Sequence, residues 1–336
     1  MNRSTTNGGA PVCVIIAAYN AQATIGRAIL SALSQAEVAE VMVIDDASPD
    51  GTADRARSLD DGTGRLTVMT LAANAGPSAA RNVAIANSRA PLIAILDADD
   101  FFLPGRFADL LAVPGWDMIA DNIAFVGEGH VDGMDIARIA AHHVPSRTLD
   151  AAAFVAGCLS RPGRYKGELG FLKPLLSRAF LDRYGLRYAE QMRLAEDYDL
   201  YVRALMAGAR FRLAGTCGYV AVERAGSLSS DHGLPDLVSF ETAVAALLAA
   251  APAEDSALRN ALSRHLAQTA RKRRHRQLLA RKHEVGLIRA IGDEARSPAN
   301  VARMLTDVAR DKLGGIRQAL LPRTQREPPD RIRFLL

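Results

Sequence analysis

Three carboxylates follow a short apolar segment near the end of the first third of the chain. Residues 92–96 are Leu-Ile-Ala-Ile-Leu, and Asp97, Asp99 and Asp100 come directly after them. An uninterrupted apolar run of this kind is typical of a strand buried on both faces. In an open α/β sheet the carboxyl end of such a strand faces the ligand crevice, where clustered carboxylates favour a hard cation. The alternative for this segment alone is an acidic turn that faces water.

Two further acidic pairs occupy comparable places in the predicted structure. Asp45 and Asp46 follow the apolar run at 41–44, so two successive strands would deliver acids to the same edge of a sheet. Glu196 and Asp197 precede a helical pattern that continues to Gly208. Acids in a first helical turn also interact favourably with the helix dipole, so this second pair has a purely structural alternative.

The first half of the chain alternates strand and helix patterns. Apolar runs rich in β-branched residues predict strands, and three-to-four-residue spacing predicts helices between them. The strands are expected at 12–17, 41–44, 66–70 and 92–96, with helices from Thr24, at 52–59 and at 77–87. This order favours an α/β fold with a mostly parallel, doubly wound sheet.

The second half has shorter and less regular patterns. Strands are expected at 117–120, 123–126, 211–213 and 219–222, and helices from near 104, at 154–159, at 177–184 and at about 194–208. From about residue 235 the sequence becomes rich in Ala, Leu and Arg with helical spacing, which predicts a separate helical region ending in an extended tail after Pro328-Pro329.

Composition limits the possible functions. The chain has 336 residues, 49% of them hydrophobic, and a formal net charge of +4, which suits a soluble globular protein with an anionic partner. Its three dispersed cysteines and the polar start predict a reduced, cytoplasmic protein without a signal peptide. The basic stretch Arg271 to Lys282 is either a solvated helix face or a contact with the anionic inner face of a membrane. Nucleic-acid binding is not expected, because no aromatic residues are interleaved with it.

Several of these segments together resemble a known family. The segments are 14–20 (VIIAAYN), 43–52 (VIDDASPDGT), 76–82 (GPSAARN), 96–100 (LDADD) and the pair Glu196-Asp197. Their order and spacing are similar to the successive motifs of family 2 inverting glycosyltransferases, across about residues 12–230. Within that family the chain is most similar to bacterial exopolysaccharide transferases of the succinoglycan type.

The resemblance implies a GT-A fold, a nucleotide-sugar donor and four divisions of the chain. These are an extended or disordered start at 1–11, a nucleotide-sugar half at 12–127, an acceptor half at 128–234 and the helical region at 235–336. It also implies roles for individual residues. On the donor side, Ala17 and Tyr19 would line the pocket of the nucleobase, Asp45 with Asp46 would bond uracil, and Arg81 would lie against the nucleobase or diphosphate. Asp97 would meet the ribose and join Asp99 at a Mn²⁺ or Mg²⁺ ion, and Asp100 would support that site. On the acceptor side, Asp197 with Glu196 would provide the general base.

These roles predict the reaction. A metal at the departing diphosphate stabilises the growing negative charge, and a carboxylate can take the proton of the attacking hydroxyl. The motifs thus predict a transfer reaction, and the resemblance to the family implies that a hexose, glucose from UDP-glucose, is moved onto a lipid-linked or growing saccharide. Two alternatives remain: a sugar nucleotidyltransferase, and a nucleotide-sugar-binding protein without catalysis.

Overall fold

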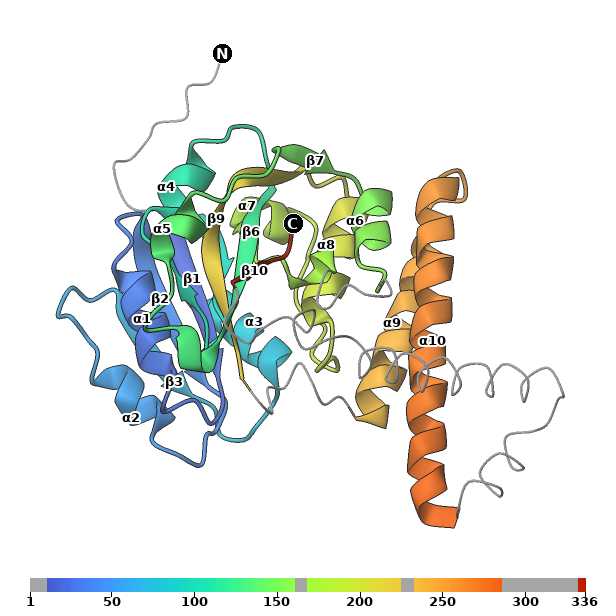
Figure 1. Cartoon of the computed structure of the whole chain (residues 1–336), viewed down its shortest axis with the longest axis horizontal. Coiled ribbons are helices and arrows are strands. Elements are labelled where there is room, and N and C mark those ends of the chain that lie inside the picture. The colour runs from blue at the N-terminus through green and yellow to red at the C-terminus, as the bar shows by residue number, and fades with distance from the viewer. Residues whose placement is uncertain (1–10, 161–167, 225–232, 286–331) are drawn as a thin grey trace, which may run out of the picture.

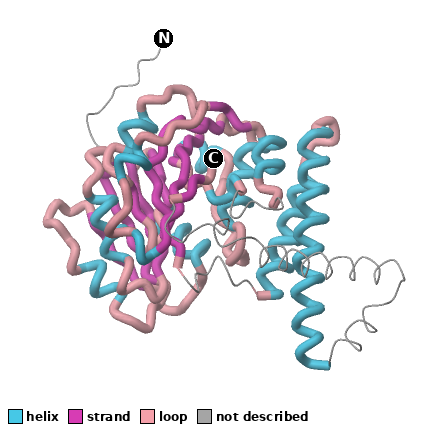
Figure 2. The backbone as a smooth tube through the Cα atoms, in the orientation of Figure 1, coloured by secondary structure: helices cyan, strands magenta, loops and turns pink. Residues whose placement is uncertain are grey.

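The computed structural model describes residues 11–160, 168–224, 233–285 and 332–336. Its centre is a ten-stranded sheet with the path β3-β2-β1-β4-β8-β6-β9-β5, and β7 and β10 pair beside β9 and β6. Helices lie on both sides of this sheet (Figures 1 and 2). The predicted α/β, mostly parallel, doubly wound class is confirmed.

The first half of the chain forms the parallel part of the sheet. Strand β1 pairs in parallel with both β2 and β4, and β2 pairs in parallel with β3. The apolar runs identified in the sequence are these strands, and β1 is buried almost throughout because helices cover both faces. The elements are β1 (Val12–Ala18), α1 (Ile25–Leu33), β2 (Val38–Asp45), α2 (Thr52–Arg57), β3 (Leu66–Thr70), α3 (Pro77–Asn87), β4 (Leu92–Ile95), β5 (Phe101–Phe102) and α4 (Arg106–Leu111).

The second half extends the sheet with mixed strand directions. Strand β8 runs antiparallel to both β4 and β6, whereas β6 and β9 are parallel. The elements are β6 (Met118–Gly127), α5 (Ile136–Ala140), β7 (Arg147–Leu149), α6 (Ala151–Gly157), β8 (Leu175–Ser177), α7 (Arg178–Arg183), α8 (Glu196–Met206) and β9 (Phe211–Glu223), with short 3-10 turns at Glu128–His130 and Leu169–Phe171.

Two predicted pairs of short strands are continuous in the structure. The expected strands at 117–120 and 123–126 are the single strand β6, and those at 211–213 and 219–222 are β9. Register shifts near Asp121 interrupt the β6 and β9 pairing without breaking either strand. Gly218 is required there, because a Cβ atom would lie 2.6 Å from Cγ of Arg106 and 2.9 Å from an oxygen of Asp121. Polar and glycine residues at this bulge interrupt the apolar pattern of both strands, and the sequence therefore predicted two short strands in place of each long one.

In the described part of the helical region, α9 (Leu234–Ala250) and α10 (Ser256–Val285) pack on each other and beside α6 and α8. Figure 1 shows α10 as a long rod at the edge of the molecule. No helix in the described part of the chain combines the length and apolar character needed to cross a bilayer. The predicted N-terminal segment, apart from residue 11, and the part of the helical region at 286–331 lie outside the described residues.

The last residues are extended, as the sequence predicts, but they return to the sheet, which was not expected of the helical region. Strand β10 (Arg333–Phe334) pairs antiparallel with Phe125 and Ala124 of β6. Strand β8 covers this side of β6 only at Met118 and Ile119, so the donors and acceptors farther along β6 are open to β10. The segment is further fixed by Leu335, whose side chain is fully buried in the main core.

Truncating Leu335 to Ala should therefore destabilise the sheet domain itself. We expect a loss of about 2–5 kcal/mol in the free energy of unfolding, because a buried leucine leaves a cavity when shortened. Denaturant unfolding measures this loss. The matched control is Leu30→Ala on α1, where the side chain is 53% exposed and the expected change is within about 0.5 kcal/mol. Equal stability of L335A and the wild type would contradict the docking of this segment.

Candidate active site

The carboxyl ends of β1 and β2 bring the predicted base-binding residues to one edge of the sheet. Ala18 is paired with Asp45, the last residue of β2. Ala17 therefore lies one position inside this edge and Tyr19 one position beyond it, with its side chain 48% exposed. The Asp45 carboxylate is buried and accepts a hydrogen bond from the backbone amide of Ser48 at 3.3 Å. These three residues lie together at this edge of the sheet.

Asp46 follows Asp45 in the chain but contacts a different loop. Its two oxygens accept hydrogen bonds from the backbone amides of Ala75 at 2.7 Å and Gly76 at 2.8 Å. Gly76 has φ +90°, a conformation that favours glycine, and it directly precedes α3. Asp46 thus fixes the loop from which α3 starts, and α3 carries Arg81.

Arg81 connects three acidic residues that are distant in sequence. Its Nη1 donates to Oε1 of Glu196 at 2.6 Å, and its Nη2 donates to Oδ1 of Asp97 at 3.0 Å. Nη1 also lies 3.6 Å from Oδ1 of Asp197. Burial opposes the charged form of Arg81, but the charges of Asp197 and Glu196 outweigh it and raise the pKa of the guanidinium.

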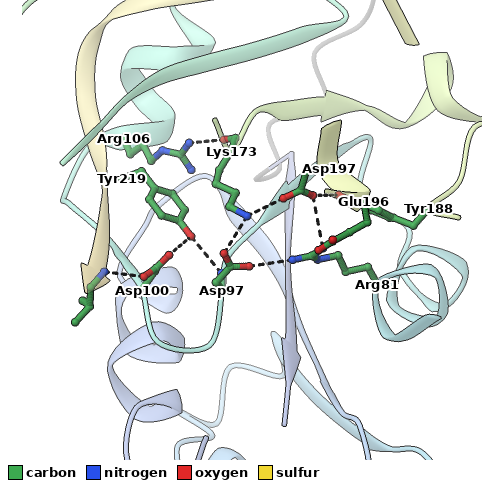
Figure 3. Close-up of polar contacts among 10 residues, drawn as sticks. Arg81, Asp97, Asp100, Arg106, Lys173, Tyr188, Glu196, Asp197 and Tyr219 are labelled. Atoms are coloured by element: carbon green, nitrogen blue, oxygen red, sulfur yellow. Dashed lines mark hydrogen bonds and ion pairs between the residues drawn. The ribbon is translucent and has the colours of Figure 1, made fainter. Parts of the chain in front are cut away.

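Lys173 forms the second link between the loop after β4 and helix α8. Its Nζ lies 2.7 Å from Oδ2 of Asp197 and 2.9 Å from Oδ2 of Asp97, as Figure 3 shows. Burial opposes its charge, yet the carboxylates of Asp197 and Asp97 raise its pKa. Conversely, burial acts against ionisation of Asp97, but Lys173 and then Arg81 lower its pKa to about 2. Lys173 and Asp97 are therefore both charged at neutral pH.

Asp197 is held at the first turn of α8. Its Oδ1 accepts a hydrogen bond from the hydroxyl of Tyr188 at 3.1 Å, and Lys173 binds its other oxygen. Ala195, directly before α8, has φ +58°, which is unusual for a residue with a side chain. This turn starts α8 so that both Glu196 and Asp197 reach Arg81, and such strain is typical of functional sites.

The remaining two acids of the loop after β4 have separate partners. Asp99 accepts a hydrogen bond from Nη2 of Arg224 at 2.6 Å. Asp100 accepts hydrogen bonds from the Tyr219 hydroxyl at 2.7 Å and the Val222 amide at 2.8 Å. Burial, and then the charges of Asp99 and Asp97, raise the pKa of Asp100. Asp100 thus anchors the loop to β9.

Four residues that the sequence analysis did not select contribute to the site: Lys173, Tyr188, Arg224 and Arg106. Lys173 could have been noticed as a single charge inside the apolar run 171–176. Arg106 is buried with Asp121, donates to the Lys173 carbonyl at 2.7 Å, and has no such signal in the sequence. Within the described residues, no group of three or more potential metal-ligating side chains converges.

The helical region supports α8 beside the acidic pair. The Tyr198 hydroxyl lies 2.8 Å from Nδ1 of His265 on α10, and the Tyr198 ring also contacts Phe240 of α9. His265 is buried, and burial, followed by the charge of Lys272, lowers its pKa from 6.5 to about 4. The imidazole is therefore neutral where it packs against α8.

This fold and the acidic loop after β4 define a GT-A-like domain. The chain belongs to Glycosyl transferase family 2, whose sequence profile matches residues 13–125. It is 48% identical over 308 residues to Succinoglycan biosynthesis protein ExoU of Rhizobium meliloti (strain 1021), covering 90% of this chain and 87% of that protein. The predicted family is confirmed.

Two more distant similarities concern one relative in sequence and one in fold. A glucosyltransferase of Escherichia coli, UDP-Glc:alpha-D-GlcNAc-diphosphoundecaprenol beta-1,3-glucosyltransferase WfgD, is 26% identical over 58% of this chain and 69% of its own length. The crystal structure of S. aureus TarS in complex with UDP-GlcNAc has a TM-score of 0.62 and 19% identity, covering 87% of this chain and 83% of that one. The TarS comparison shows a shared fold.

Acidification should weaken the packing of α10 against α8. The unfolded chain binds a proton at His265 below pH 6.5, whereas the folded chain does so only near pH 4, so stability falls as the pH decreases between these values. This group alone should remove up to about 3 kcal/mol of unfolding free energy. Denaturant unfolding at several pH values should show a smaller decrease for His265→Leu, whereas His143→Gln at an exposed position should keep the wild-type decrease. An unchanged pH dependence in H265L would contradict this.

Proposed function

We propose that the chain is an inverting glycosyltransferase that moves a hexose, glucose from UDP-glucose, onto a lipid-linked or growing polysaccharide in exopolysaccharide synthesis. One observation carries this proposal. Lys173 binds Asp97, which follows β4, and Asp197, which begins α8, at 2.9 and 2.7 Å. The residue assigned to the donor and the residue assigned to the base are thus neighbours in one charged cluster.

Three buried arginine atoms around the acidic loop support diphosphate binding. The Nε atoms of Arg27, Arg81 and Arg224 have no hydrogen-bond partner among the described residues. Each of these arginines also donates to the loop, Arg27 to the Asp99 carbonyl, Arg81 to Asp97 and Arg224 to the Asp99 carboxylate. Buried donors are normally satisfied, so anionic oxygens are suitable partners for them. The uridine would then lie over Ala17, Tyr19 and Asp45.

Asp99 is the residue best suited to hold Mn²⁺ or Mg²⁺. Both oxygens of Asp97 are already bound to cationic side chains, whereas Asp99 has one such partner, Arg224, in the described part of the chain. One carboxylate is compatible with a divalent ion whose other ligands are substrate phosphates and water. When bound, such an ion would neutralise the charge that grows on the departing diphosphate.

We assign the role of general base to Asp197. A carboxylate oxygen accepts more than one hydrogen bond, so an acceptor hydroxyl can bind while Lys173 and Tyr188 remain in contact. Asp197 would take the hydroxyl proton as the oxygen attacks the anomeric carbon. If the hydroxyl attacks from the face opposite to the diphosphate, the configuration inverts.

The substrates are proposed from the relatives. ExoU is named for succinoglycan biosynthesis, and WfgD is named for glucosyl transfer from UDP-Glc to a diphosphoundecaprenol-linked sugar. These names favour a glucosyl donor and a lipid-linked acceptor.

A donor screen tests this function. We expect UDP release from UDP-glucose in the presence of Mn²⁺ or Mg²⁺, and little release after chelation of the metal. Asp197→Asn should reduce turnover by about 10²-fold or more while UDP binding persists, because the amide cannot accept the proton. Released UDP and calorimetric UDP affinity are the two measurements, and Asp182→Asn, at an exposed surface ion pair, is the matched control.

The same screen separates the alternatives. Pyrophosphate release from a nucleoside triphosphate would instead favour a sugar nucleotidyltransferase. Tight UDP binding without turnover of any donor or acceptor would favour a binding protein. Near-normal turnover in D197N would remove Asp197 from the role of base.

We also propose that the chain contacts the anionic inner face of the cell membrane through α10. Basic residues dominate this helix, in which Glu284 is the single acid of the sequence 256–285. Arg264, Lys272 and Arg274 are exposed along it, so their charges can reach a surface without any change in the core. Exposed cations on a helix are attracted to anionic lipid headgroups.

Vesicle co-sedimentation tests this contact. The triple variant R264Q/K272Q/R274Q should bind vesicles of phosphatidylglycerol and phosphatidylcholine at least about tenfold more weakly than the wild type. The control R57Q/R89Q/R183Q removes the same charge from exposed positions elsewhere in the chain and should bind as the wild type does. Equal loss in both triple variants would indicate a general charge effect and would contradict docking through α10.

A further inference from the structure

Lys173 is the buried cation that directly joins the donor and acceptor sides of the site. Its Nζ lies within 2.9 Å of Asp97 and 2.7 Å of Asp197. Arg81 is a weaker link to Asp197, since its Nη1 is 3.6 Å from that carboxylate and 2.6 Å from Glu196. Among the described residues, Lys173 therefore makes the shortest ionic contact with the proposed base.

The central sheet fixes the backbone close to Lys173. Lys173 lies two residues before Leu175, which pairs with both Ala94 of β4 and Ile119 of β6. The antiparallel register with β4 brings Lys173 alongside the end of β4, where Asp97 follows. The position of the ammonium group is thus set by the central sheet.

The buried ion pair of Arg106 with Asp121 holds the backbone of Lys173. Arg106 Nη2 donates to the Lys173 carbonyl at 2.7 Å and to Oδ1 of Asp121 at 2.8 Å. The guanidinium also packs over the rings of Phe102 and Tyr219, at 4.7 and 5.3 Å from their centroids. Figure 3 shows Arg106 and Lys173 on the same side of the site as Tyr219. Tyr219 in turn donates to Asp100 in the acidic loop.

From this geometry we infer that Lys173 is a positioning residue for the transfer reaction: it aligns the carboxylate of Asp197 with the donor held near Asp97. This inference rests on the proposed function and adds a residue to it. Without the ammonium group, Oδ2 of Asp197 loses its cationic partner, and both the Tyr188 hydroxyl and Arg81, at 3.6 Å, contact only the other oxygen. The carboxylate can then rotate away from the acceptor hydroxyl, while the uridine contacts at β1 and β2 stay intact.

The test is a double-mutant cycle on UDP release from UDP-glucose with Mn²⁺. Lys173→Met should lower kcat by about 10²-fold and leave KM for the donor within about threefold, because a small displacement of a reacting group has a large effect on rate. In the Asp197→Asn background the same substitution should lower kcat by less than about threefold, since the two residues act as one unit. Lys173→Arg keeps a cation and should recover about tenfold of the loss.

The outcomes are separable. Arg210→Met removes the cation of a surface pair with Asp117 and serves as the control, with unchanged kcat expected. A K173M enzyme with near-normal kcat would overturn the role of Lys173. Equal losses of kcat in the wild-type and D197N backgrounds would also overturn it, because a purely structural residue lowers kcat in both backgrounds. If K173M does not fold, K173R replaces it in the cycle, with the same non-additivity expected. A wild type that releases no UDP overturns the proposed function before any variant is compared.

Discussion

The site depends on one constraint: three carboxylates, Asp97, Glu196 and Asp197, share a partly closed space with two buried cations, Arg81 and Lys173. Removing either cation would leave three carboxylates with a single cation in a buried site, which is strongly unfavourable. The elements that carry these residues therefore cannot shift independently. An ionic cluster of this kind contributes less to stability than to a defined arrangement of its members.

The surrounding fold supplies a separate support for each member of the cluster. Asp46 orders the loop before α3 and so orients Arg81, while Arg106 with Asp121 holds the backbone of Lys173. On the other side, Tyr198 packs between the helical region and the core, next to Asp197. Helices α9 and α10 and the final segment at β6 thus pack directly against the sheet domain.

Much of the first half could be predicted from the sequence because its physics is local. Apolar runs such as 92–96 form buried parallel strands regardless of distant residues, and the motifs after them lie where parallel strands end. The second half could not be divided correctly, because a bulge at Asp121 and Gly218 interrupts the apolar pattern of two continuous strands. The docking of Leu335 on β6 depends on an open strand edge that no nearby sequence reveals.

The residues of the site also divide into those that local motifs predict and those that only the fold brings together. Asp97, Arg81, Glu196 and Asp197 lie in recognisable motifs, and the structure brings them together. Lys173 and Arg224 meet their acidic partners only through tertiary pairing, across 76 residues for Lys173 and Asp97 by their numbering in the chain. Asp46 could be assigned to the donor by resemblance, but its contacts with the amides of Ala75 and Gly76 are visible only in the fold.

The most direct test of the account is a crystal structure of the chain with UDP and Mn²⁺. The account predicts the uridine over Tyr19 and Asp45, the diphosphate at Asp99 beside Arg27, Arg81 and Arg224, and the carboxylate of Asp197 facing the β-phosphate across a space that can hold a hexose. A diphosphate bound away from Asp99, or an Asp197 carboxylate that faces a different surface from the β-phosphate, would contradict it.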